Sequence, residues 1–373
     1  MSSTFDAAEL EALLSVPDGP CASIFLPTPP SGGPALRISL GHRLEEAGAF
    51  LAAAGVPAEA IEAAVAEGRR LVEEASPPRG NSASLALFLA PELQSLYLLP
   101  TTPNEETIGG QVPHVLPLVA LLADLEPFLV LALGQKSVQL YRADRYSIEK
   151  LDLHGPDLDL ESVLGEDRER GTRQMHSAGR GPGVVHGQGS LADEHKDALV
   201  RWCRGVDDAI RDRIAGTPPM VLAAVDYVAA IFRQVSRYPG LQEDGIDTAV
   251  DPTAVPVLRD RGWEIVGRSL EQRRGEALDR FRSLWGTGKA SADLAEVLAA
   301  AEQGRIELLL CTGATCYGPY PFPGGATSRA SQEPGTEELV NRAAVETLRK
   351  GGRVEQVAPE ALDGEAVGAV FRW

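Results

Sequence analysis

The stretch "FLVLALGQKSVQLYRA" (Phe128–Ala143) decides the fold of the middle of the chain. Its first half is a short apolar run, which predicts a buried strand over Phe128–Gly134. Its second half alternates apolar and polar residues, which predicts an antiparallel neighbour over Ser137–Ala143. Gly134-Gln135-Lys136 makes the tight connection between them. The middle of the chain therefore begins with a β-hairpin.

Helices and a further strand follow this hairpin. A helix is expected from about Asp193 to Ala215, because apolar side chains recur there at helical spacing: Leu199, Cys203, Val206 and Ile210. "PMVLAAV" (Pro219–Val225) predicts a second buried strand, and a helix begins at Asp226. We interpret Asp226 as the N-cap of that helix rather than as a catalytic acid. This order of elements is typical of an α/β domain.

A glycine-rich stretch, 167–190, separates the hairpin from the first of these helices. It reads "DRERGTRQMHSAGRGPGVVHGQGS", without apolar periodicity, and predicts a long exposed loop. Between Arg168 and Gly189 it has four arginines and one acid, Glu169, so its local charge is 4 − 1 = +3. The arginines are Arg168, Arg170, Arg173 and Arg180.

The N-terminal part also mixes strands and helices. "CASIFLP" (Cys21–Pro27) predicts a strand, and two Ala/Glu-rich stretches near 36–54 and 57–75 have helical spacing. We interpret the acidic residues of these helices, Glu45 to Glu74, as solvated faces. "SLALFLA" and "SLYLLP" predict two strands that meet at a turn, Pro91-Glu92. The tripeptide Gly109-Gly110-Gln111 follows them.

A third pattern starts near Arg273. Ser291 and Asp293 open a helix that Gly304 stops, and "RIELLLC" then predicts a strand. After a long irregular loop, Thr336 is expected to cap a second helix. "RVEQV" and the terminal "AVGAVFRW" predict closing strands. Together these elements predict a small α/β/α sandwich of about 100 residues.

Composition narrows the class of protein. A chain of 373 residues exceeds the usual size of one core, so we expect two or three domains. We find no signal peptide and no apolar run long enough to span a membrane, so we expect no membrane partner. Four scattered cysteines indicate a reducing cytoplasm. The net charge of −18 argues against non-specific binding of nucleic acids, in which lysine and arginine neutralise phosphates.

Several catalytic and metal sites are disfavoured by spacing. Cys311 and Cys316 lack a second cysteine pair, and the histidines lack the spacing of zinc ligands, so no metal is expected. The first strand of the middle domain has no carboxylate for a two-metal nuclease, since Asp124 precedes it and Asp144 follows the hairpin. "LWGTGKAS" departs from a phosphate-binding loop because Ala290 stands in place of Ser or Thr. No nucleophile elbow occurs. We interpret four dispersed tryptophans as packing anchors: Trp202, Trp263, Trp285 and Trp373.

Several motifs carry a resemblance when taken in order. "ADLAEVLAAAEQGRIELLL", "GGRVEQV" and "AVFRW" are similar to the third domain of archaeal and eukaryotic class-1 release factors and Pelota. With "CASIFLPTPP" and "FLVLALGQKSVQLYRA" they most resemble the bacterial and archaeal release-factor-like proteins, over nearly the whole chain. The resemblance implies an α/β protein of three domains. These are an N-terminal α/β domain (1–120), an RNase H-like middle domain (121–272) and a C-terminal α/β/α domain (273–373) that resembles kink-turn-binding ribosomal proteins.

The resemblance also bears on the Gly-Gly-Gln tripeptide. True release factors carry it in the middle domain, in a loop before a long helix. In this chain that position holds His186, Gly187, Gln188 and Gly189, whereas Gly109-Gly110-Gln111 lies before the middle domain. We therefore interpret Gly109-Gly110-Gln111 as a linker or a turn leading into a strand, where the glycines supply backbone freedom. The codon-reading Asn-Ile-Lys-Ser tetrapeptide is missing as well.

The expected function is that of a non-catalytic, cytoplasmic release-factor-like protein without cofactor. It would bind ribosomes, structured RNA or a protein partner in translation or stress. Two alternatives stay open: a hydrolase acting on a nucleic acid or an ester bond at the middle-domain loop, and a scaffold without RNA contact. We expect the RNA- or ribosome-facing residues to lie in that loop: Arg168, Arg170, Arg173, Arg180, His186, Gly187, Gln188 and Gly189.

Overall fold

The computed structural model is a mixed α/β structure that divides into two compact units. The first unit combines residues 1–124 with 272–373, and the second spans 125–271. The structure describes residues 3–28, 34–75, 83–134, 137–153, 188–247, 255–321, 329–333 and 335–373.

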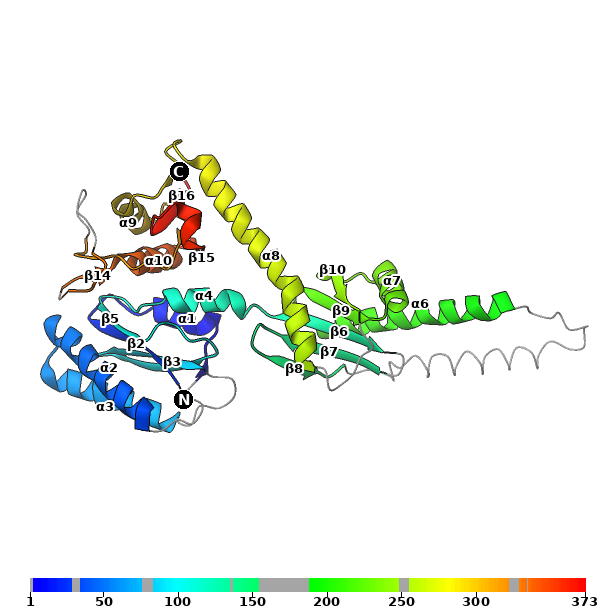
Figure 1. The fold of residues 1–373 in the computed structure, drawn as a ribbon, viewed down its shortest axis with the longest axis horizontal. Helices are drawn as coiled ribbons and strands as arrows, with labels where there is room; N and C mark the ends of the chain where they lie inside the picture. Colours follow the sequence, from blue (N-terminus) through cyan, green and yellow to red (C-terminus); the bar gives the residue numbers. More distant parts are fainter. Residues whose placement is uncertain are drawn as a thin grey trace, which may run out of the picture. The chain divides into compact units, whose positions relative to one another are not determined.

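The N-terminal part of the first unit is a sheet with helices on both faces (Figure 1). Its strand order is β1-β4-β3-β2-β5, so β5 forms one edge. The strands are β1 (Ser3–Thr4), β2 (Cys21–Pro27), β3 (Ser84–Ala90), β4 (Leu93–Leu99) and β5 (Glu106–Gly110). The helices are α1 (Ala7–Leu14), α2 (Pro34–Ala53), α3 (Ala58–Glu74) and α4 (Leu116–Asp124).

Apolar alternation explains how this sheet is covered. One core cluster joins Ile24 of β2 and Leu87 of β3 to Leu44 of α2 and Val72 of α3, all of them buried. The opposite face carries aromatic side chains, among them Phe25, whose ring meets that of Phe88 edge to face. The predicted strands at 21–27 and 84–90 and the two predicted helices are confirmed. The strand predicted at 95–100 is also found, and it runs from Leu93 to Leu99.

The C-terminal part of the first unit is a second sheet, with strand order β11-β16-β12-β15. Helices α9 and α10 pack on one face of it. The end of the long helix α8 packs on the other through Phe281. The strands are β11 (Ala290–Ser291), β12 (Ile306–Cys311), β15 (Arg353–Gln356) and β16 (Val367–Phe371). The helices are α8 (Val255–Leu284), α9 (Leu294–Glu302) and α10 (Leu339–Arg349), and a small ribbon pairs β13 (Tyr317–Gly318) with β14 (Glu337–Glu338).

The second unit is built on a sheet with strand order β10-β9-β6-β7-β8. β6, β9 and β10 are parallel, whereas β7 and β8 run antiparallel to their neighbours. The strands are β6 (Phe128–Gly134), β7 (Ser137–Ala143), β8 (Ile148–Leu151), β9 (Met220–Ala224) and β10 (Leu241–Ile246). Helices α6 (Gln188–Arg213) and α7 (Asp226–Val235) pack on one face, and the first part of α8 packs on the other.

The predicted hairpin of this second unit is confirmed, with Leu131 of β6 opposite Leu140 of β7. The predicted apolar stripe of the following helix is buried, from Leu199 to Ile210. That helix begins at Gln188, earlier than the expected Asp193. The connection 135–136 lies outside the described residues.

Several sequence predictions about helix ends are wrong. Glu338, not Thr336, caps α10, because its carboxylate accepts hydrogen bonds from the first amides of the helix. Asp226 is the first residue of α7 rather than its N-cap, which is Val225. Asp293 does cap α9, as predicted.

Arg273, near which the third pattern is expected to start, lies inside α8, because one helix runs from Val255 to Leu284. The second segment of the first unit begins one residue earlier, at Gln272. The prediction is wrong for two of the tryptophans. Trp285 and Trp373 are not packing anchors, since their exposed fractions are 56% and 66%. Trp202, by contrast, is buried.

Candidate functional site

Gly109 and Gly110 lie in a strand, not in a linker or a turn. They are the last residues of β5 and stand opposite Ala22 and Cys21 of β2. Neither has a positive φ, so backbone freedom does not explain them. At Gly109 the reason is steric, because a Cβ there would lie 2.6 Å from the ring carbon Cγ of Phe50 on α2. Gly109 therefore allows α2 to pack closely against the sheet.

A side chain from the C-terminal part holds the same residue in place. The Gly109 N–H donates to Oε1 of Gln332 at 3.2 Å, and Nε2 of Gln332 donates to the Gly109 carbonyl. Nε2 also donates to the Thr336 carbonyl at 3.1 Å. The Gln332 amide thus occupies the outer edge of β5 much as a neighbouring strand would. The Gly-Gly-Gln stretch is tied into the structure at this point.

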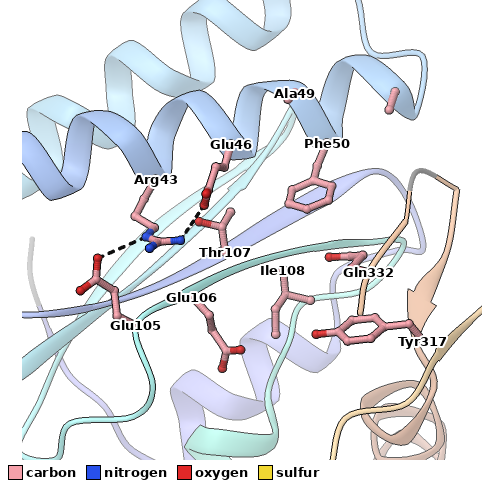
Figure 2. Close-up of a pocket in the computed structure, with 11 residues that line it drawn as sticks. Arg43, Glu46, Ala49, Phe50, Glu105, Glu106, Thr107, Ile108, Tyr317 and Gln332 are labelled. Atoms are coloured by element: carbon pink, nitrogen blue, oxygen red, sulfur yellow. Dashed lines mark hydrogen bonds and ion pairs between the residues drawn. The ribbon is translucent and has the colours of Figure 1, made fainter. Parts of the chain in front are cut away.

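A pocket of about 430 Å³ lies beside this stretch (Figure 2). Helix α2 contributes Arg43, Glu46 and Phe50, whereas β5 and the residue before it contribute the acidic side. The C-terminal part closes it with an aromatic ring and the Gln332 amide. The residues from β5 and the C-terminal part are Glu105, Glu106, Thr107, Ile108, Tyr317 and Gln332.

The pocket has more negative than positive groups. Its one guanidinium among the described residues, that of Arg43, lies 2.7 Å from the Glu46 carboxylate and 3.3 Å from the Glu105 carboxylate. Glu106 is half-buried, and burial raises its pKa, although the charge of Arg43 lowers it in part. Glu46 and Glu105 therefore share one arginine, and Glu106 has no hydrogen bond or ion pair with the described residues.

Two hydroxyl groups complete the lining. The Thr107 hydroxyl is buried and has no hydrogen-bond partner in the described part of the chain. Burial, together with the charges of Glu338 and Glu106, raises the pKa of Tyr317 to about 12, so its phenol stays neutral. The pocket thus offers hydrogen-bonding groups, two aromatic rings and surplus negative charge.

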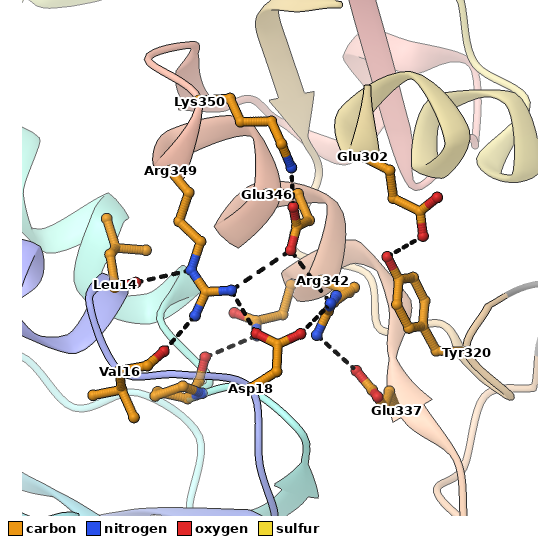
Figure 3. A network of polar contacts seen from close by, with 12 residues as sticks. Leu14, Val16, Asp18, Glu302, Tyr320, Glu337, Arg342, Glu346, Arg349 and Lys350 are labelled. Carbon is orange, nitrogen blue, oxygen red and sulfur yellow. Dashed lines mark hydrogen bonds and ion pairs between the residues drawn. The ribbon is translucent and has the colours of Figure 1, made fainter. Parts of the chain in front are cut away.

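A second polar cluster joins α10 to the chain segment after α1 (Figure 3). Arg342 is buried, with 5% of its surface exposed, and donates to the Asp18 carboxylate. Arg349 also binds Asp18, at 2.6 Å, and donates to the Leu14 and Val16 carbonyls. Burial alone would raise the pKa of Asp18, but the hydrogen bonds from Arg349 and Arg342 lower it below its usual value.

The remaining charges of this cluster balance one another. Glu346 lies 3.3 Å from Arg342 and also binds Lys350. Glu337 lies 3.9 Å from Arg342, whose guanidinium stacks 4.2 Å from the centre of the Tyr320 ring. Because every acid here faces a base, the cluster is a joint between two parts of the first unit.

Buried amide and carboxyl groups extend this joint. The side-chain oxygen Oδ1 of Asn341 accepts a hydrogen bond from the Val115 N–H at 2.7 Å, and its side-chain nitrogen Nδ2 donates one to the Pro113 carbonyl at 3.0 Å. Glu338 accepts from three backbone amides, and burial still raises its pKa to about 7. His114 is fully buried, and burial lowers its pKa to about 3, so it stays neutral.

The residues expected to face RNA fall outside these sites. Arg168, Arg170, Arg173, Arg180, His186 and Gly187 lie outside the described residues. Gln188 and Gly189 open helix α6, although their side chains are not described.

No metal site is formed in the described part of the chain. No group of three or more His, Cys, Asp or Glu side chains is placed there to hold an ion. Asp144, a candidate carboxylate, instead accepts hydrogen bonds from the Tyr146 and Ser147 amides and so fixes a turn. Burial raises the pKa of the Cys203 thiol to about 12, which makes it a poor nucleophile. No helix among the described residues is long and apolar enough to cross a bilayer.

Sequence patterns missed both the pocket and the joint. Glu46, taken as part of a solvated face, lines the pocket and binds Arg43. The pocket and the joint each assemble from residues hundreds of positions apart, such as Gly109 with Gln332 and Asp18 with Arg342.

Comparison with known proteins finds a family match for part of the chain. Residues 127–305 match the family described as bacterial archaeo-eukaryotic release factor family 3. The chain is thus release-factor-like over these residues, and the resemblance inferred from the sequence motifs is confirmed. No curated protein matches the chain.

Solved structures give weaker likenesses. The archaeal translation termination factor aRF1 is 13% identical, with 99% of each chain covered and a TM-score of 0.25. Archaeoglobus fulgidus Pelota is 12% identical, with 76% of this chain and 77% of Pelota covered and a TM-score of 0.34. S. cerevisiae Dom34, a translation termination-like factor, is 11% identical, with 78% and 74% covered and a TM-score of 0.37.

Proposed function

We propose that this protein associates with ribosomes as a release-factor-like factor and does not hydrolyse peptidyl-tRNA. The family match over residues 127–305 supports the link to translation. The observation that carries the second part is the placement of Gly109 in β5, held by Phe50 and Gln332. A catalytic tripeptide must reach a substrate, and this one is bound on both sides by its own chain.

The position that the resemblance assigns to the release tripeptide supports the same proposal. It holds Gly187-Gln188-Gly189, in which histidine and a single glycine precede the glutamine. This order leaves one glycine, rather than two, ahead of the glutamine. We infer that the segment before α6 contacts a partner rather than a scissile ester bond.

We also propose three domains: residues 1–120, 121–272 and 273–373. The strand order β10-β9-β6-β7-β8 supports an RNase H-like middle domain, because a β-hairpin meander there continues into parallel strands. The four-stranded sheet with α9 and α10 on one face and α8 on the other supports a C-terminal α/β/α domain. A cytoplasmic location is part of the same proposal.

If the protein contacts RNA, we expect the contact at the arginines of 167–190. Each phosphate contact contributes a slope of about 0.7–0.9 to the salt dependence of affinity, so four contacts give about three logs per tenfold change in salt. Charge reversal at Arg173 and Arg180 should then abolish binding at moderate salt. Reversal at Lys289, which is exposed and lies elsewhere, is the matched control.

Co-sedimentation with ribosomes over a salt series tests the proposal. We expect the protein to pellet with ribosomes at low salt and to dissociate as salt rises. A protein that stays in the supernatant at every salt concentration would contradict ribosome association.

A scaffold without RNA contact is the second candidate, because many described arginines are already paired. Arg211 and Arg237 bind Asp208, Arg268 binds Asp244 and Arg280 binds Glu307. Binding that is indifferent to salt would favour this candidate, since protein contacts depend less on released counterions.

A further inference from the structure

The outer edge of β5 has backbone groups that no strand of the sheet uses. β5 is an edge strand, with β2 on one side only. The N–H and C=O of Gly109 point away from β2 and bind Gln332. Thr107 lies two residues earlier, so its N–H and C=O point to the same outer edge. Unpaired groups of this kind are a template for another strand.

The pocket runs along this part of the edge and draws side chains from both faces of β5. Successive residues of a strand point to opposite faces, so Thr107 lies on the α2 side with Phe50, whereas Glu106 and Ile108 lie on the other (Figure 2). A strand added at the edge would therefore place its own alternating side chains into the pocket.

The charge of the pocket selects the kind of side chain. Glu46 and Glu105 already hold one guanidinium, that of Arg43, and Glu106 is left without an ion pair among the described residues. The rings of Phe50 and Tyr317 also line the pocket, and aromatic faces attract cations. A polyanion such as RNA would be repelled by these carboxylates, as by a chain of net charge −18.

We propose that the edge of β5 binds an extended segment of a basic protein partner. The segment adds a strand beside Thr107 through main-chain hydrogen bonds and places an arginine or lysine side chain against Glu106. This inference goes beyond the proposed ribosome association and does not depend on it.

Binding of a designed peptide to the full chain, without ribosomes, tests the inference. The probe is a short fluorescent peptide of alternating arginine and valine with blocked ends, followed by anisotropy. One matched peptide has citrulline for arginine, which removes the charge but keeps the shape. Another has methylated backbone amides, which removes strand hydrogen bonds. Glu106→Gln is the test variant, and Glu45→Gln, an exposed position of α2 outside the pocket, is its control.

We expect saturable binding of the parent peptide. A charge-assisted hydrogen bond is worth enough that Glu106→Gln and the citrulline peptide should each weaken binding about tenfold or more. Glu45→Gln should leave the affinity unchanged, and the methylated peptide should bind far more weakly than the parent. The inference is overturned if the parent does not bind, if both glutamine variants weaken binding equally, or if the citrulline or methylated peptide binds as tightly as the parent.

Discussion

Replacement of Gly109 by alanine is the sharpest test of the structural role assigned to the Gly-Gly-Gln stretch. The added Cβ would lie 2.6 Å from Phe50 Cγ and 2.7 Å from Phe50 Cβ. Carbon atoms in favourable contact are about 3.5–4.0 Å apart, so the overlap is about 1 Å. Either the ring of Phe50 or strand β5 must move. Overpacking of this kind costs about 1–3 kcal/mol of unfolding free energy.

The neighbouring glycine supplies the matched control. At Gly110 the nearest atom to an added Cβ is the Val112 carbonyl oxygen at 3.5 Å, an ordinary contact. Gly110→Ala should therefore change stability little, and it can gain about 0.4–1 kcal/mol by restricting the unfolded chain.

Hydrogen exchange of the β2 and β5 amides measures the loss of local stability at the two strands beside the clash. Faster exchange there is expected in Gly109→Ala but not in Gly110→Ala. The thermal midpoint of the first unit should fall by about 2–4 °C for each kcal/mol lost. Adding Phe50→Ala to Gly109→Ala removes the ring that clashes, so the double variant should lose less stability than the sum of the two single variants. If the two alanine variants protect β5 equally well, the steric reasoning is refuted.

Further expectations concern the buried polar groups around α10. The pKa of Glu338 is raised to about 7 from 4.5, so its contribution to stability is complete below pH 4.5 and is lost as pH rises through 7. Unfolding free energy measured over this range should decline less steeply in Glu338→Gln. The pKa of His114 is lowered to about 3 from 6.5, so its contribution is present above pH 6.5 and is lost as pH falls towards 3; acid titration of stability should show this opposite slope. Arg342→Met should cost about 3–5 kcal/mol in denaturant unfolding, because it removes one of the two guanidinium groups that bind Asp18 and the one base that faces Glu337 among the described residues, and further loss of Asp18 should cost less in that background. Asn341→Ala should cost about 2–3 kcal/mol by the same assay, because buried backbone groups lose their partner; an unchanged midpoint would contradict that role.

The sequence predicts what depends on local pattern. The apolar run at Phe128–Gly134 is explained by burial of both faces of a strand, and the stripe from Leu199 to Ile210 by burial of one face of a helix. The cap at Asp293 was predictable because an aspartate there precedes an apolar helix.

Features set by distant contacts could not be predicted in this way. Glu338 is the cap of α10 because it also binds the Cys316 amide across the β13–β14 ribbon, whereas Thr336 is the more usual residue type. The two glycines at 109 and 110 suggested flexibility, but the need for glycine at 109 comes from Phe50 on α2.

The pocket could not be predicted from the sequence for the same reason. Its lining comes from α2, from β5 and the residue before it, from Tyr317 in β13 and from Gln332. No spacing rule joins Glu106 to Tyr317, and only the fold brings them to one place. The family match, in contrast, rests on the middle of the chain, where the sequence motifs were already suggestive.

A peptidyl-tRNA hydrolysis assay on stalled ribosomes tests the central claim most directly. The full chain is added to ribosomes that carry a labelled nascent peptide, and released peptide is measured against the uncatalysed rate. The account predicts no release above that rate, for the natural chain and for Gln111→Ala alike. Release well above the uncatalysed rate that disappears in Gln111→Ala would contradict it, because the tripeptide in β5 would then be catalytic.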